Sequence, residues 1–205
     1  MKRFWVLAGM VVAFCGLFVS CATSIPVSSN INDFVMMGIK TNRNEPVSLQ
    51  LVSNIHDGEY VVLNKDGKDS GAKVSFIESS TLQHMIREYM TSKFSDLSEE
   101  GTTAIIITLQ DFSYSFYTTE GTGMQVLRGL AGSTSGMPCI VSARISLSVE
   151  VNRNGTVETK NIISTAEQSF ITGTAVYQKE AADCVNSANN KALMLLNSYF
   201  EELQI

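Results

Sequence analysis

The segment 139–151 constrains the fold most strongly, because its apolar residues occupy every second position. Odd positions from Cys139 to Val151 are all apolar, and even positions from Ser142 are polar or charged. Strict alternation predicts a strand with one face in the core and the other in solvent. Asn154-Gly155 follows, and this pair favours the type I′ turn of a two-residue hairpin. The sequence therefore predicts an antiparallel hairpin whose second strand covers residues 157–172.

A second long β segment, residues 103–117, changes the parity of its apolar positions. These fall first on odd and then on even numbers: Ile105, Ile107, Leu109, Phe112, Tyr114 and Phe116. One extra residue would keep both halves on the same buried face, so we expect a bulge near Gln110 or Asp111. Shorter apolar runs at 34–39, 47–52 and 60–63 lie between turn-forming residues and predict further strands.

Two segments have the apolar spacing of amphipathic helices. The first begins at Ser80, where Ser80-Thr81-Leu82-Gln83 fits a capping box. Its apolar stripe consists of Leu82, Met85, Ile86, Tyr89, Met90, Phe94 and Leu97. The second covers about 178–203, and its stripe consists of Ala181, Cys184, Val185, Ala188, Ala192, Leu195, Leu196, Tyr199 and Leu203. We expect an α+β fold with a mainly antiparallel sheet and both helices packed on one face.

Residues 1–20 have the three-part layout of an export signal. Lys2 and Arg3 precede an uncharged run, 4–19, which is short for a transmembrane helix. Removal of this segment takes away both basic residues and no acidic one, so the formal net charge changes from -5 to -7. The mature chain lacks the positive field that nucleic-acid binding needs, and we expect no nucleic-acid partner.

The residues Phe18-Val19-Ser20-Cys21 resemble the lipobox of bacterial lipoproteins. This resemblance implies that 1–20 is a lipoprotein signal peptide and that Cys21 carries the lipid, palmitate included. Because Ala22 follows Cys21, it also implies sorting to the outer membrane, with the domain facing the periplasm. The alternative is a plain secretory signal that ends beside a cysteine. Residues 21–32 are small and polar and predict a flexible tether to a single domain at 33–205.

Cys139 and Cys184 are the cysteines that remain for the mature domain. In an oxidising compartment we expect a disulfide between them, because both lie on predicted buried faces. Two separate buried thiols are the alternative. His56 and His84 are the only histidines, and with two sulfurs they give no zinc-type ligand spacing. We therefore expect no metal site.

The sequence shows no pattern that indicates catalysis. The glycine-rich segment 129–136 lacks the lysine of a Walker loop, and Gly121-Thr122-Gly123 lacks the third glycine of a dinucleotide fingerprint. His84 lies between polar neighbours, off the stripe of its helix, so we expect it in solvent. We predict that the protein is not an enzyme and uses no cofactor.

Residues 118–137 form a long connection between two adjacent predicted strands. Met124, Val126, Leu127 and Leu130 within it have the spacing of a short apolar helix. Two interpretations stay open: a lid that closes one end of the core, or a partner-binding or membrane-facing loop, which exposed apolar side chains would favour.

The order of elements resembles that of the YajG-like bacterial outer-membrane lipoproteins over roughly 33–205, and it is also similar to auxiliary lipoproteins of envelope ABC transporters. The shared order is strands, the helix from Ser80, a strand with 104–107, the hairpin through Val151 and Val157, and an Ala- and Asn-rich final helix. We expect a non-catalytic cell-envelope lipoprotein, a structural or adaptor component that binds an envelope protein complex. The alternative is a transport auxiliary that handles a lipid or small hydrophobic ligand. A filled core would favour the adaptor, and a continuous apolar groove the auxiliary.

Overall fold

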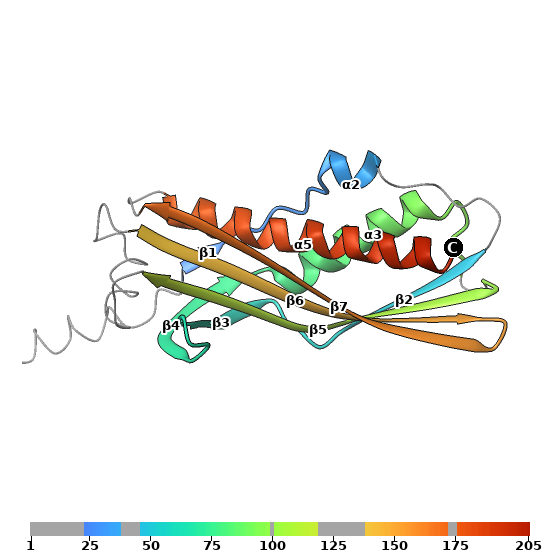
Figure 1. The fold of residues 1–205 in the computed structure, drawn as a ribbon, viewed down its shortest axis with the longest axis horizontal. Helices are drawn as coiled ribbons and strands as arrows, with labels where there is room; N and C mark the ends of the chain where they lie inside the picture. Colours follow the sequence, from blue (N-terminus) through green and yellow to red (C-terminus); the bar gives the residue numbers. More distant parts are fainter. Residues whose placement is uncertain (1–22, 38–45, 99–100, 119–137, 172–175) are drawn as a thin grey trace, which may run out of the picture.

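The computed structural model shows an α+β domain with helices on one face of a sheet (Figure 1). It describes residues 23–37, 46–98, 101–118, 138–171 and 176–205. Three strands of 16 residues each run the length of the sheet: β5 (Thr103–Thr118), β6 (Pro138–Arg153) and β7 (Thr156–Ile171). The predicted α+β class is confirmed.

The long hairpin follows the pattern of the sequence. β6 and β7 pair antiparallel from Pro138↔Ile171 to Arg153↔Thr156. Asn154 and Gly155 have φ values of 53° and 82°, and positive φ at both central residues is what a type I′ turn requires. All odd positions of β6 from Cys139 to Val151 are buried. The predicted hairpin is confirmed.

β5 contains the predicted bulge, because its register with β6 shifts between Leu109 and Asp111. Odd residues are buried before the shift and even residues from Phe112 after it. The bulge lies where β5 changes neighbour on its other edge. β2 (Val47–Ser53) runs parallel to its first half, and β3 (Gly58–Leu63) runs parallel to Tyr114 and Ser115.

The sheet is mixed, which corrects the expectation of a mainly antiparallel one. Its order is β1-β4-β3-β5-β6-β7, with β2 also beside β5. β4 (Asp69–Phe76) pairs antiparallel with β3, and the short β1 (Thr23–Ile25) pairs parallel with β4. An alternating pattern tells which side chains are buried, but it contains no information on the direction of the neighbouring strand, which here depends on connections through helices.

The first apolar run of the predicted domain forms a helix and not a strand. Residues Asp33–Met37 are the short helix α2, which begins where the Val35 amide donates to the Asn32 carbonyl at 2.8 Å. Val35 is buried against the core cluster. The strand prediction for 34–39 is wrong within the described residues, because so short an apolar run has no distinguishing period.

Part of the predicted flexible tether, 21–32, contributes contacts to the domain. Ile25 in β1 is fully buried. The Asn32 amide donates to Asn190 Oδ1 at 2.6 Å, and Asn190 Nδ2 donates to the Asn30 carbonyl at 3.4 Å. Residues 23–32 are therefore counted with the domain, whereas the predicted signal peptide and Cys21 lie outside the described residues.

The two long helices, α3 (Glu78–Lys93) and α5 (Val176–Glu202), lie on the same face of the sheet (Figure 1). Their apolar stripes are buried as predicted, with three exceptions. Leu97, beyond the end of α3, and Leu203 are half-buried, and Leu195 is exposed while Leu193 is buried in its place. The capping box is wrong, because α3 begins at Glu78 and Ser80 lies within its first turn. Asp57, in the turn before β3, accepts from the Ser80 amide at 3.1 Å and from the Ser80 hydroxyl.

Candidate functional site

The predicted site residues divide into two groups. Cys21 and the loop residues Met124, Val126, Leu127 and Leu130 lie outside the described residues. Cys139 and Cys184 are described, and both are buried free thiols. His84 is exposed, as predicted.

The predicted disulfide between Cys139 and Cys184 is not formed in the structure. Cys184 Sγ donates to the carbonyls of Ala166 at 3.4 Å and Val141 at 3.6 Å. Burial raises the pKa of the Cys139 thiol, and it raises the pKa of the Cys184 thiol to about 11. Both groups are therefore protonated at neutral pH and poor nucleophiles. The sequence pattern gave the face on which each sulfur lies, but not its position along that face.

The candidate site is the face of the sheet that points away from α3 and α5, called here the uncovered face. It carries the alternate, outward side chains of β2, β5, β6 and β7, and no helix among the described elements lies on it (Figure 1). Small hydroxyl groups dominate its central rows. The rows across β5, β6 and β7 are Thr108-Ser148-Asn161, Ser113-Arg144-Thr165 and Ser115-Ser142-Glu167.

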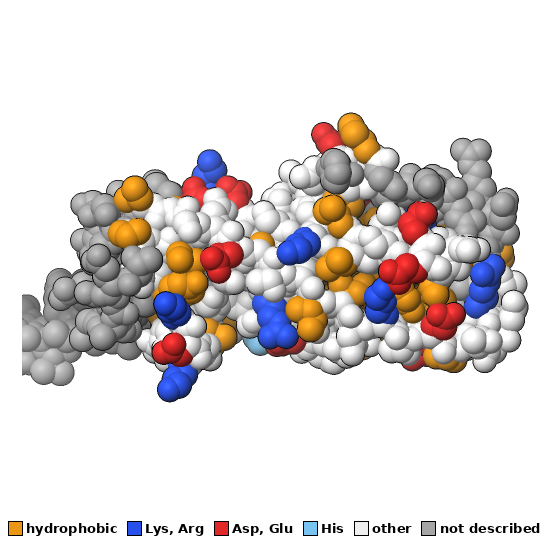
Figure 2. Space-filling model, in the orientation of Figure 1, with side chains coloured by type: hydrophobic (Ala, Val, Ile, Leu, Met, Phe, Trp, Pro, Cys, Tyr) orange, Lys and Arg blue, Asp and Glu red, His pale blue; other side chains and the backbone are white. Residues whose placement is uncertain are grey.

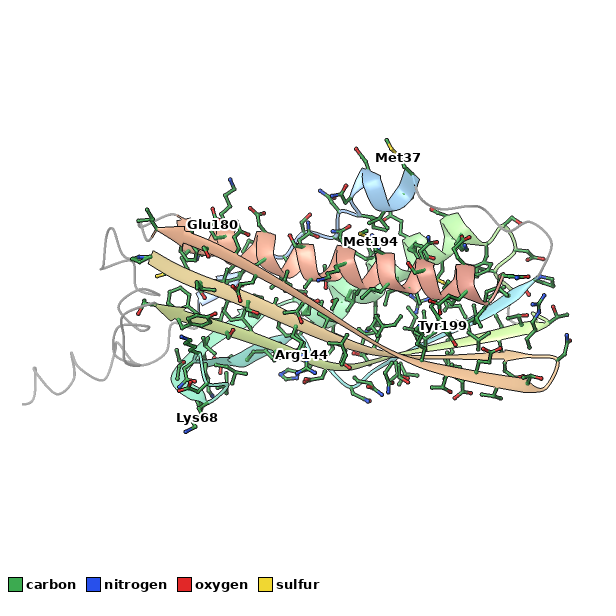
Figure 3. The ribbon with its side chains drawn as sticks, in the orientation of Figure 1. Met37, Lys68, Arg144, Glu180, Met194 and Tyr199 are labelled. Atoms are coloured by element: carbon green, nitrogen blue, oxygen red, sulfur yellow. The ribbon has the colours of Figure 1, made fainter. Side chains whose placement is uncertain are left out.

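Two charged residues at even positions of the alternating segment 139–151, Arg144 and Glu150, lie on this face. Arg144 is exposed on β6 between Ser113 and Thr165 (Figure 3). Glu150 is half-buried between Ile106 and Thr159. Within the described part of the chain, no ion pair satisfies Arg144.

Exposed apolar side chains follow the same face along the edge strand β7. Val157, Ile163 and Ile171 are 53%, 50% and 66% exposed. In the view of Figure 2, apolar side chains are scattered between charged ones. The backbone edge of β7 is partly occupied, because Lys191 Nζ donates to the Thr165 carbonyl at 3.1 Å. The uncovered face thus suits side-chain contact better than addition of a strand.

The space between the helices and the sheet is filled by side chains. Leu82, Met85 and Tyr89 of α3 are fully buried and belong to one core cluster that reaches the C-terminal Ile205. A half-open pocket of about 500 Å³ lies beside α3 and β2, where Arg87, Leu49 and Leu97 contribute to its wall. It is a surface pocket and not a groove through the core.

The described residues contain neither a candidate metal site nor a candidate membrane-spanning helix. No three His, Cys, Asp or Glu side chains in these ranges come together in a way that would hold a metal ion. None of the described helices is long and apolar enough to span a membrane.

No protein-family model and no curated protein matches the sequence. Among solved structures, an uncharacterised protein is similar at a TM-score of 0.47 with 10% identity, over 90% of this chain and 99% of that one. A neuraminyllactose-binding hemagglutinin homologue from Helicobacter pylori is similar at a TM-score of 0.44 with 6% identity, over 85% of this chain and 91% of that one. At these scores nothing about function is carried over from either protein.

Proposed function

We propose that this chain is a non-catalytic lipoprotein of the cell envelope that acts as an adaptor. In this proposal, Cys21 is the lipid anchor in the outer membrane, the domain faces the periplasm, and the uncovered face binds an envelope protein. The resemblance to the YajG-like lipoproteins is part of the proposal. The observation that carries it is the uncovered face itself, with its exposed Arg144 and Ile163.

The size of the uncovered face suits a protein partner. Strands of 16 residues are about 50 Å long, and three of them are about 14 Å wide at the usual rise and spacing. The resulting area of about 700 Å² is close to the roughly 800 Å² that each partner contributes to a standard interface. Its mixture of hydroxyl, charged and apolar side chains is also typical of non-obligate interfaces.

The filled core supports the adaptor over a carrier of lipids. A carrier of a long hydrophobic ligand needs an apolar cavity, and the buried stripe of α3 occupies the space where it would lie. One observation favours the alternative of a transport auxiliary. The pocket beside α3 combines Arg87 with the apolar side chains of Leu49 and Leu97, which suits a small ligand with an apolar part.

The proposal is tested by capture of partners from crosslinked envelopes with two matched variants. Ile163→Arg places a charge on the uncovered face, and Met194→Arg places one on α5, at similar exposures of 50% and 42%. We expect Ile163→Arg to lose the captured protein and Met194→Arg to retain it, with unchanged circular dichroism for both. Capture by both variants, or loss in both, would exclude the uncovered face as the binding site.

A separate measurement tests the anchor. Mass spectrometry of the mature protein should find an acylated Cys21 at the N-terminus, and Cys21→Ser should release the protein from membranes. An N-terminus elsewhere, or an unmodified Cys21, would contradict the assignment. This outcome is independent of the capture experiment.

A further inference from the structure

We propose that one end of the domain lies against the bilayer surface, so that the long strands stand away from the membrane. This membrane-facing end consists of the end of β5 at Thr118, the start of β6 at Pro138, the end of β7 at Ile171, and the turn 64–68 between β3 and β4. The inference rests on the proposed lipid anchor at Cys21.

The strand pairing decides which end of the domain the anchor reaches. β1 is parallel to β4, β4 is antiparallel to β3, and β3 is parallel to β5. β1 therefore runs opposite to β5, and the chain enters β1 from the end at which β5 finishes. Figure 1 shows β1 near the same end as the arrowheads of β5 and β7.

The connection between lipid and sheet is too short to act as a spacer. Only Ala22 separates Cys21 from Thr23, which pairs with Val74 in the sheet. Two residues span at most about 7 Å, so an acyl chain on Cys21 enters the bilayer close to β1. A domain held at this distance must turn one end to the membrane.

The long strands extend further in the same direction. Thr23 pairs with Val74 and Val74 with Tyr60, and Tyr60 lies two residues before Val62, the partner of Tyr114. Thr23 is therefore near the level of Phe112, and β5 continues for six residues to Thr118. Six residues add about 20 Å, which is more than the reach of about 7 Å from Thr23 to Cys21 and the headgroup layer of roughly 5–7 Å together. The strand ends therefore reach the membrane surface together with the lipid.

The side chains at this end are compatible with a lipid surface. Ile171 is 66% exposed, and Pro138 beside it in the register is exposed too. Lys65 and Lys68 are exposed in the turn 64–68, where Figure 3 labels Lys68, but the nearby Asp66 and Asp69 are also exposed. These charges balance one another, so we expect the contact to be independent of the fraction of anionic lipid.

The test compares the two ends of one strand. The acylated protein is reconstituted in phosphatidylethanolamine and phosphatidylglycerol vesicles that contain a nitroxide at the lipid headgroup. A fluorophore is attached to Ile171→Cys or to Thr156→Cys, both exposed and about 50 Å apart along β7. Ser169→Cys, also exposed, reports on the same end if Ile171→Cys does not fold. Protein without an added cysteine gives the background of the two buried thiols.

We expect the lipid nitroxide to quench the label at 171 several-fold more than the label at 156, at both low and high phosphatidylglycerol. Insertion of 20 Gly and Ser residues between Ala22 and Thr23 should lower quenching at 171 to the level at 156, because such a linker spans about 25 Å. Equal quenching at the two positions, stronger quenching at 156, or quenching that persists after the insertion would overturn the inference.

Failure of the inference and failure of the proposed function are distinguishable in the same preparation. If mass spectrometry finds an acylated Cys21 and the two labels are quenched equally, the orientation is wrong and the anchored adaptor stands. If Cys21 carries no lipid, the proposed anchor and the orientation both fall. Capture by the Ile163→Arg variant reports on neither of these points.

Discussion

The buried carboxyl group of Glu78 makes the stability of this domain depend on pH. Glu78 is fully buried in the first turn of α3, beside the equally buried Asn189 of α5. Among the described residues, no group completes a hydrogen bond to either carboxyl oxygen or to the Asn189 side chain. Burial raises the pKa of Glu78 to about 8, although the nearby Asn189 amide lowers it, and the charge of Asp57 raises it further.

The size of the effect follows from the two pKa values of Glu78. The pKa of about 8 in the folded state lies above the value of 4.5 in the unfolded state. The contribution of Glu78 to the free energy of unfolding is therefore fully present below about pH 4.5. This contribution is lost as the pH rises from 4.5 towards 8, and the free energy of unfolding then changes little with pH. At 1.36 kcal/mol per unit, the loss is about 3 kcal/mol at pH 7 and about 5 kcal/mol well above pH 8.

Urea unfolding at pH 4.5, 7 and 8.5 measures this loss when Glu78→Gln is compared with the unmodified protein. The glutamine variant has no proton to lose, so its free energy of unfolding should exceed that of the unmodified protein by about 3 kcal/mol more at pH 7 than at pH 4.5. Glu88→Gln, at an exposed position of the same helix, should keep the pH profile of the unmodified protein. Parallel profiles for Glu78→Gln and the unmodified protein would refute the reasoning.

Three further predictions concern the core, the thiols and the loop. Tyr114→Phe removes the buried bond between the Tyr114 and Tyr177 hydroxyls, 3.2 Å long, and should lower the free energy of unfolding by about 1 kcal/mol in urea titrations; an unchanged midpoint would show that this bond does not stabilise the fold. Cys139 and Cys184 should react with a maleimide only after denaturation, without prior reduction; a mass lower by two hydrogen atoms in the untreated protein would instead reveal a disulfide. Replacement of 119–137 by a short Gly/Ser turn should leave circular dichroism, the thermal midpoint and partner capture almost unchanged, because the proposed contact lies on the uncovered face; lost capture would move the contact to this segment, and an unfolded product would identify it as a lid on the core.

The features that the sequence predicts well are those with a local physical cause. The alternation in 139–151 and the Asn154-Gly155 turn both belong to one hairpin. The sequence alone therefore predicts the bounds of β6 and β7 and the face of β6 that is buried. The change of parity near Gln110 likewise indicates a bulge without knowledge of the neighbouring strands. The same parity places Arg144 and Glu150 on the uncovered face, which is the part of the candidate site that the sequence could reveal.

The features that the sequence does not predict depend on contacts between residues far apart in the chain. β1 is too short to show a period, and its pairing with β4 needs tertiary contacts. The sequence predicts the start of α3 at Ser80, two residues after its actual start at Glu78. The Ser80 amide donates to Asp57, which lies in a different turn, and no local pattern reveals this contact. Nothing local signals the burial of Glu78, since a glutamate in the first turn of a helix is ordinarily favoured by the helix dipole and left in solvent. The exposed apolar side chains of β7 also lack a strong signal, because Val157, Ile163 and Ile171 are separated along the outward face by polar residues.

The brevity of β1 has a mechanical consequence for a chain that is pulled from its N-terminus. Tension applied through residue 23 is carried first by three residue pairs with β4 and then by the contacts of Asn190 with Asn30 and Asn32. The long pairings of β5, β6 and β7 bear no load until the pairing of β1 with β4 and the Asn190 hydrogen bonds have both broken. Once released, residues 23–32 span at most about 33 Å, and the uncovered face stays intact. The N-terminal segment is therefore an extensible link that yields before the domain does.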